Sequence, residues 1–203
     1  MSREWEIRLF MMKKLAYISK MSDQGEGKAY LSNLRKGIGH VPGEIPELMG
    51  ILLTDMPEEF MSKSSTATKE EWACYIALTL FAMHQQGNDM NSHPMHTDKR
   101  MSIGTAMRDY VMQANDSNAR ERMAVKLQAL GTSKDMNELS YHLKSIIHLL
   151  KSSGIPLNYA ELAGDIYDYQ FPERQPDVRL KWGQDFYRNV KLENKAKEES
   201  NNE

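Results

Sequence analysis

The residues between Glu70 and Gly87 predict a helix that is apolar on all sides and not only along one stripe. From Trp72 to Met83 every residue is apolar except Thr79. A helix at the surface of a globular protein has one apolar stripe and one polar face. Because this segment is apolar on all sides and shorter than the roughly 20 residues that span a bilayer, we expect a buried central helix.

Residues at the two ends of this segment predict where the helix begins and ends. Thr68 and Glu71 match the T-x-x-E capping box, in which each side chain bonds the backbone N–H of the other residue. Gly87 can take the left-handed conformation that ends many helices. A helix that is apolar on all sides needs the rest of the chain to cover it.

The other segments also favour helix, because apolar residues recur at helical spacing and β-branched residues are sparse. No alternating run is bounded by hairpin turns. The fold class is therefore predicted to be all-α. The expected helices are Arg3 to Lys20, Gly25 to Lys36, Glu47 to Leu53, the central segment, Ser102 to Ala114, Ser117 to Gly131, Ser133 to Gly154, Asn158 to Tyr169, and a last helix from Asp177.

The spacing of apolar residues also predicts which side of some helices faces inward. In the first helix these residues are Trp5, Leu9, Met12 and Ile18, with Met11 and Leu15 nearby. In the helix that ends near Gly154 they are Leu139, Leu143, Ile146, Ile147 and Leu150. In the last helix they are Val178, Trp182, Phe186 and Val190.

Capping residues and prolines assign the helix ends in the second half of the chain. Ser117 and Ser133 are the expected N-caps of two helices, and Asn158 with Glu161 forms an N-x-x-E capping box. Pro172 and Pro176 are expected to break the chain before the last helix.

The predicted helices fall into two packed bundles around the central helix. Residues 1–115 form an N-terminal bundle and residues 116–192 a C-terminal bundle. A long loop over residues 88–101 lies within the first bundle, and loops of this length in compact domains are usually functional or mobile. Residues 193–203 form a polar tail with a net charge of −2, which we expect to be disordered.

Composition narrows the class of protein. An apolar fraction of 40% and a charged fraction of 27% are typical of a globular protein in water. The N-terminus lacks the layout of a secretory signal, and the single cysteine, Cys74, is expected to be a buried apolar residue in a reducing cytoplasm. A net charge of −2 excludes binding of polyanions by the bulk charge of the chain.

Basic residues are nevertheless concentrated in three segments. Residues 28–39 and 141–151 contain basic residues and no acid, and residues 99–126 carry a net charge of +3. Lys144, His148 and Lys151 are spaced i, i+4, i+7 and share one helix face. Each such residue alone is most simply a solvated side chain. Together the three segments can form a groove that binds a phosphate backbone by charge.

The sequence contains none of the common catalytic motifs for nucleotide binding, zinc proteases or serine hydrolases. His93 and His96 lie in the long loop without an adjoining acidic cluster, so we interpret them as flexible loop residues and expect no metal. His84 is interpreted as a hydrogen-bonded residue near the core. Asp165 and Asp168 are interpreted as a solvated pair. We expect no cofactor and no enzymatic activity.

Five segments resemble, in order and at the expected spacing, the motifs of one family. They are LSNLRKGIGHVPGEIPE, WACYIALTLFAMHQQG, MSIGTAMRDY, LKSIIHLLKSSGIPLNYAELAGDIYDY and WGQDFYR. They are similar to motifs of the CasB small subunit family of the type I-E CRISPR Cascade complex. The resemblance covers about residues 28 to 190.

The resemblance implies a non-catalytic, cytoplasmic, two-bundle helical subunit that acts in antiviral defence. Two copies would lie along the inner face of Cascade, between the large subunit and the backbone subunits that carry the guide RNA. Their basic surface would hold the displaced non-target DNA strand and stabilise the R-loop, with CRISPR RNA as a further candidate ligand. A membrane partner is not expected.

The family motifs match six basic positions of this chain. Two further basic residues, Arg108 and Lys126, lie in the basic segment over residues 99–126. The candidate nucleic-acid-binding residues are Arg35, Lys36, Lys99, Arg100, Arg108, Arg122, Lys126 and Lys144. Lys36 and Lys144 replace a frequent arginine of the family, which keeps the charge and loses the planar guanidinium. The alternative is a purely architectural subunit that bridges the large and backbone subunits without touching nucleic acid.

Overall fold

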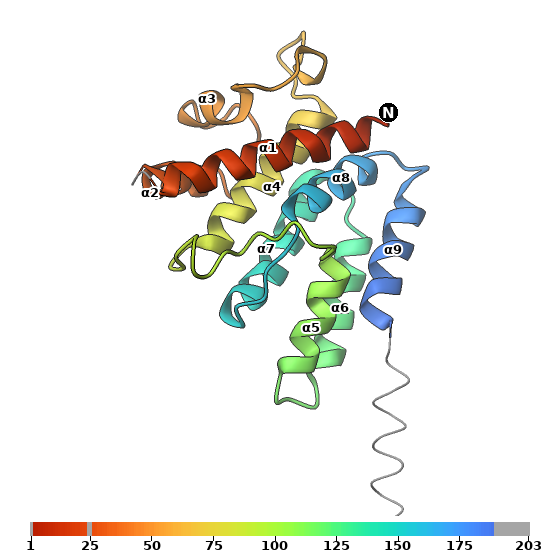
Figure 1. The fold of residues 1–203 in the computed structure, drawn as a ribbon. Helices are drawn as coiled ribbons and strands as arrows, with labels where there is room; N and C mark the ends of the chain where they lie inside the picture. Colours follow the sequence, from red (N-terminus) through yellow and green to blue (C-terminus); the bar gives the residue numbers. More distant parts are fainter. Residues whose placement is uncertain (1, 24–25, 189–203) are drawn as a thin grey trace, which may run out of the picture.

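The computed structural model describes residues 2–23 and 26–188, and within them the protein is helical (Figure 1). The α-helices are α1 (Arg3–Asp23), α2 (Gly27–Lys36), α3 (Glu47–Leu53), α4 (Lys69–Gln85), α5 (Ile103–Gln113), α6 (Ala119–Gly131), α7 (Met136–Ser152), α8 (Tyr159–Tyr169) and α9 (Gln175–Tyr187), with a 3₁₀ turn, η1 (Glu58–Phe60). In the described part of the chain the only β-type contact is an isolated bridge between His96 and Leu157. The all-α prediction is confirmed.

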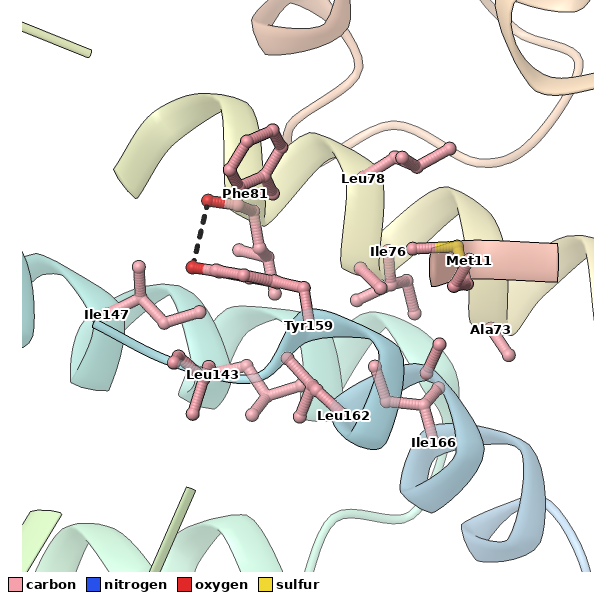
Figure 2. Close-up of a cluster of buried hydrophobic side chains, with 14 of the residues drawn as sticks. Met11, Ala73, Ile76, Leu78, Phe81, Leu143, Ile147, Tyr159, Leu162 and Ile166 are labelled. Atoms are coloured by element: carbon pink, nitrogen blue, oxygen red, sulfur yellow. Dashed lines mark hydrogen bonds between the residues drawn. The ribbon is translucent and has the colours of Figure 1, made fainter. Parts of the chain in front are cut away.

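Helix α4 is the buried centre that its apolar pattern predicts. From Ala73 to Gln85 every residue is buried. Helices α1, α2, α7 and α8 all pack against it. Figure 2 shows Ile76 on the side of α4 that faces Leu143 and Ile147 of α7 and Leu162 and Ile166 of α8. The hydroxyl of Tyr159 donates to the carbonyl of Leu80 at 3.4 Å, the dashed bond in that view.

The two ends of α4 also form as predicted. Thr68 Oγ1 accepts from the Glu71 N–H at 3.0 Å, and Glu71 Oε2 accepts from the Thr68 N–H at 2.7 Å, so the capping box is complete. Gly87 follows the helix with φ of 88°, a conformation that glycine adopts without steric cost.

Helices of the two halves of the chain pack against each other. Helix α8 packs along α1, and α5 packs against α9 and α6 (Figure 1). The buried apolar residues of all these helices form one continuous cluster. The division into bundles near residue 115 stays a prediction, and the expected tail at residues 193–203 lies outside the described residues.

The first helix is rotated relative to its predicted orientation. Trp5 is 43% exposed and Met12 is 41% exposed, so the prediction that they face inward is wrong. The buried residues of α1 are Ile7, Phe10, Met11, Lys14, Leu15 and Ile18. Helix α1 has apolar residues on several sides, and packing against α8 selects the side that is buried.

Three helix starts differ from the prediction. Helix α6 begins after Asn118 rather than Ser117. The N-cap of α7 is Asp135, whose carboxylate accepts from the Glu138 N–H at 2.9 Å, while the hydroxyl of Ser133 donates to a carbonyl of the preceding helix. Helix α9 begins at Gln175 with proline in its first turn, where a missing N–H costs nothing, so Pro176 does not break it.

Candidate nucleic-acid interface

Helix α7 separates apolar and basic side chains onto different faces. The five apolar residues predicted to face inward are buried: Leu139, Leu143, Ile146, Ile147 and Leu150. Lys144, His148 and Lys151 follow the opposite, solvent-facing side at a spacing that keeps them in one row. Because the buried stripe fixes the rotation of the helix, the basic row is fixed with it.

The C-terminal end of α7 meets the C-terminal ends of α2 and α4. Lys151 Nζ donates to Gln86 Oε1, just after α4, at 3.1 Å. Burial lowers the pKa of Lys151, and the positive charge of Arg35 on α2 lowers it further. Arg35 and Lys151 are therefore neighbours in space, although more than 100 residues separate them in the chain. Cations at helix C-termini interact favourably with the helix dipole.

The flank of α7 next to this basic row is joined to α6 through a further basic residue. Lys126 Nζ donates to Ser145 Oγ at 2.6 Å, directly beside Lys144 in sequence. We use the name α7 basic face for Arg35, Lys126, Lys144, His148 and Lys151. Within the described residues no carboxylate lies within salt-bridge distance of any of these five side chains.

Three of the predicted residues are instead held by carboxylates near α5. Arg108 bonds Asp109 at 2.9 Å, and Arg122 bonds Asp116 at 2.5 Å. The side-chain hydrogen bond from Arg122 lowers the pKa of Asp116. Arg100, which is mostly exposed, lies 3.7 Å from a buried carboxylate oxygen of α9.

That buried carboxylate belongs to Asp185, which organises the start of α5. Its Oδ2 accepts from Ser102 Oγ at 2.6 Å, and Ser102 is the N-cap of α5. Its Oδ1 lies 3.7 Å from Arg100 and 3.6 Å from Arg188. Arg100 is therefore positioned by the fold, next to a compensating negative charge.

The structure thus brings together only part of the predicted set. Lys144 lies on α7, Lys126 bonds Ser145 of the same helix, and the charge of Arg35 acts on Lys151 at its C-terminal end. Lys36 is exposed and follows Arg35 at the end of α2. Lys99 is exposed, and its carbonyl accepts from Asn158 Nδ2 at 3.1 Å. Within the described part of the chain, no side-chain hydrogen bond or ion pair connects Lys99, Arg100, Arg108 or Arg122 to α7.

His84, near the end of α4, lies in the core. His84 is fully buried, and its Nδ1 lies 2.8 Å from the hydroxyl of Tyr159. Burial, together with the charge of Lys151, lowers the pKa of His84 to about 4. Its interpretation as a hydrogen-bonded core residue is confirmed.

The interpretation of His96 as a flexible loop residue is wrong. Its Nδ1 accepts from the Tyr159 N–H at 3.3 Å, which leaves Nε2–H to donate to Asp98 at 3.2 Å. Burial lowers the pKa of His96. Met90 and Met95 are buried nearby, and the Gln85 side chain bonds the loop backbone at three points, so the loop is anchored. No three potential metal-ligand side chains cluster in the described residues.

Asp165 is buried and paired, so its interpretation as part of a solvated pair with Asp168 is also wrong. Its carboxylate accepts from Trp182 Nε1 at 2.8 Å and from Lys181 Nζ at 2.6 Å. Arg8 of α1 lies 3.6 Å away. Asp168 pairs with Arg174 at 2.9 Å. These contacts tie α8 to α9 and α1.

Lys151 belongs to the face at α7 but is not among the eight candidates. The signal is present in the sequence, since Lys151 lies on the same helix side as Lys144 and His148. Its proximity to Arg35 requires the packing of α2 and α7 around α4, which the local sequence does not encode.

In the described residues, basic side chains of α2, α6 and α7 thus lie at α7, and no carboxylate is within salt-bridge distance of them. The family model of the CRISPR-associated protein Cse2 matches residues 30–187. This chain therefore belongs to the Cse2 family, the CasB small subunit family that its sequence motifs predict.

Two solved structures share the fold. CasB from Thermobifida fusca is 26% identical with a TM-score of 0.71, and the match covers 89% of this chain and 97% of that one. A Cse2-family CRISPR-associated protein from Thermus thermophilus is 18% identical with a TM-score of 0.62, over 92% of this chain and 99% of that one. Nothing among the curated proteins matches the chain. No helix in the described residues is long and apolar enough to cross a membrane.

Proposed function

We propose that this protein is the non-catalytic small subunit of a type I-E CRISPR Cascade complex and that it binds the displaced non-target DNA strand. Two copies would lie along the inner face of the complex, in contact with the large subunit and with the backbone subunits that carry CRISPR RNA. The strand would follow the α7 basic face, with the exposed Lys36 and Lys99 as further contacts. Binding would stabilise the R-loop.

The observation that supports this proposal is the row of Lys144, His148 and Lys151 on the outer side of α7, opposite the buried apolar residues of that helix. The positive charge of Arg35 on α2 lowers the pKa of Lys151 in this row, and no carboxylate of the described residues lies within salt-bridge distance of either side chain. Like charges at short range are unfavourable for the free protein. A phosphate backbone placed between them removes this repulsion, so the face is suited to an anionic chain.

Modest contacts of this kind are sufficient for R-loop stabilisation. The RNA–DNA heteroduplex is about as stable as the DNA duplex it replaces, so protein contacts to the backbone can shift the equilibrium. A face of lysine and arginine side chains recognises phosphates without reading bases. This suits a strand whose sequence changes with every target.

Photo-crosslinking in the assembled complex tests the proposal. Cascade is produced by co-expression of the neighbouring genes, and the non-target strand carries photoreactive nucleotides. We expect crosslinked peptides from α2, α6 and α7 of this subunit, with crosslinks lost when Arg35, Lys126, Lys144 and Lys151 are all changed to Gln. Crosslinks confined to other subunits would contradict the proposal.

One observation favours the architectural alternative. Val125 is 61% exposed and Tyr187 is 52% exposed, and both line a hollow of about 500 Å³ between α6 and α9. An exposed apolar hollow suits a neighbouring protein. If architecture were the whole role, removing the four basic side chains would impair assembly of the complex, and the binding of free single strands would not change.

A further inference from the structure

Tyr141 is an exposed aromatic residue on the same helix as the basic row. Its side chain is 69% exposed, the highest value among the exposed large apolar residues described. Its ring contacts the ring of His142 at a centroid distance of 5.4 Å, edge to face. Most of the tyrosine surface is therefore accessible to a ligand from solvent.

The position of Tyr141 continues the basic row by one turn. Tyr141, Lys144, His148 and Lys151 occupy positions i, i+3, i+7 and i+10 of α7, which lie on one side of a helix. Ten residues of helix are about 15 Å long. Stacked DNA rises about 3.4 Å per nucleotide along its axis, so the row matches the rise of about four stacked nucleotides.

Acidic residues mark where this row ends. Asp135 and Glu138 lie just before Tyr141, at the N-terminus of α7. The carboxylate of Asp135 accepts from the Glu138 N–H at 2.9 Å, and Glu138 accepts from the Lys134 N–H at 2.8 Å. Both carboxylates are thus used in capping the helix, and Tyr141 stands at the boundary between the cap and the cations.

We propose that Tyr141 stacks on a base of a single-stranded nucleic acid whose phosphates lie along Lys144, His148 and Lys151. Aromatic rings beside a cationic track are the usual way in which proteins hold single strands without sequence preference. A duplex keeps its bases stacked on each other, so Tyr141 would give the face its preference for single strands. This inference rests on the proposed function of the α7 basic face.

The test compares Tyr141→Ala with Tyr141→Phe in the full-length protein, using fluorescence anisotropy with a labelled oligothymidine strand and a matched duplex. Stacking contributes about 1–3 kcal/mol per base, so Tyr141→Ala should weaken single-strand binding at least about fivefold. Tyr141→Phe keeps the ring and should bind as the wild type does. Duplex binding should not change in either variant.

Salt dependence separates stacking from charge. The ring releases no counterions, so Tyr141→Ala should leave the slope of log K against log salt unchanged, whereas Lys144→Gln should reduce it by about 0.7. Tyr17→Ala is the matched control, because Tyr17 is 51% exposed on α1 and packs edge-on against Tyr30. It should bind as the wild type does, and circular dichroism should show equal helix content in all variants.

The possible failures are distinguishable. If wild-type protein binds no single strand, the proposed function is wrong and the inference is lost with it. If wild-type protein binds and Tyr141→Ala binds equally well, only the role of Tyr141 is wrong. An equal loss on the duplex, or a loss with Tyr141→Phe as large as with Tyr141→Ala, would also overturn stacking.

Discussion

Basic residues on α7 and basic residues near α5 look alike in the sequence but differ in what lies opposite them. On the α7 basic face, Arg35 and Lys151 are neighbours with like charges, and Lys126 bonds a neutral serine. Near α5, Arg108 and Arg122 are paired with aspartates. A charge paired within its own chain must break or share that pair to bind a phosphate, so local partners decide which basic residues are available.

The largest expected effect comes from removing unpaired charges. Arg35→Gln, Lys144→Gln and Lys151→Gln combined should reduce the salt slope of single-strand binding by about two and the affinity by about 100-fold at ~0.1 M salt, because each single-strand phosphate contact contributes about 0.7 to the slope. Filter binding over a salt series measures both.

A second variant matches the first in the number of charges it removes. It combines Arg108→Gln, Arg122→Gln and Arg174→Gln, three arginines that pair with Asp109, Asp116 and Asp168. Its salt slope should change less than that of the α7 variant. Equal changes in the two variants would show that local pairing does not matter.

Acid pH should lower the stability of the folded protein through His84. The pKa of His84 falls from an ordinary value of 6.5 to about 4 in the folded protein. The unfolded chain therefore binds more protons in this range, and stability present above pH 6.5 is lost as pH falls toward 4. We expect about 2 kcal/mol of lost unfolding free energy between about pH 7 and pH 5 from this group.

Urea unfolding at several pH values checks this expectation, with His84→Gln as the comparison. The variant should lose less stability over the same range, although His96, whose pKa burial also lowers, contributes in the same direction. Identical pH dependence in the two proteins would contradict the assignment to His84.

Asp185→Asn should affect stability more than binding. It replaces a buried carboxylate that accepts from Ser102 and lies beside Arg100 and Arg188. Hydrogen bonds to charged groups contribute about 1.5–3 kcal/mol, and the amide retains part of this bond, so we expect a loss of about 1–2 kcal/mol in thermal or urea unfolding. Asp116→Asn, at an exposed pair, should affect stability much less than Asp185→Asn.

The smallest effect is expected for Arg35→Gln alone. Removing the like charge should raise the pKa of Lys151, which Arg35 lowers in the wild type. Unfolding free energy should change by only ~0.5 kcal/mol or less, as is usual for exposed charges. An NMR titration of the Lys151 ammonium measures the shift, and Lys36→Gln should move it less. A lower pKa in Arg35→Gln would show that the two residues are not neighbours.

Much of the fold can be predicted because some apolar patterns are compatible with only one position or rotation of their helix. Helix α4 is apolar on all sides and capped at both ends, so only a central position buries it. The apolar row of α7 likewise determines which side faces the core. Helix α1 has apolar residues on more than one side, so its contact with α8 decides its rotation, and the apolar spacing alone misplaces Trp5 and Met12.

The candidate site is less predictable because it depends on contacts between distant residues. The sequence identifies Lys144 and Arg35 as basic, but not the carboxylate partners of Arg100 or the neighbour of Lys151. Asp165 looks solvated until Trp182 and Lys181, one helix later, are seen to bond it. Tertiary packing supplies this information, and spacing along one helix does not.

The lifetime of the R-loop is the most direct test of the central claim that unpaired charges at α7 hold the strand. Cascade is assembled with the Arg35, Lys144 and Lys151 variant or with the matched Arg108, Arg122 and Arg174 variant, and R-loop dissociation is followed on a target DNA. We predict a shorter lifetime for the first and a lifetime near that of the wild type for the second. Equal lifetimes in all three complexes, or a shorter lifetime only with the second variant, would contradict the account.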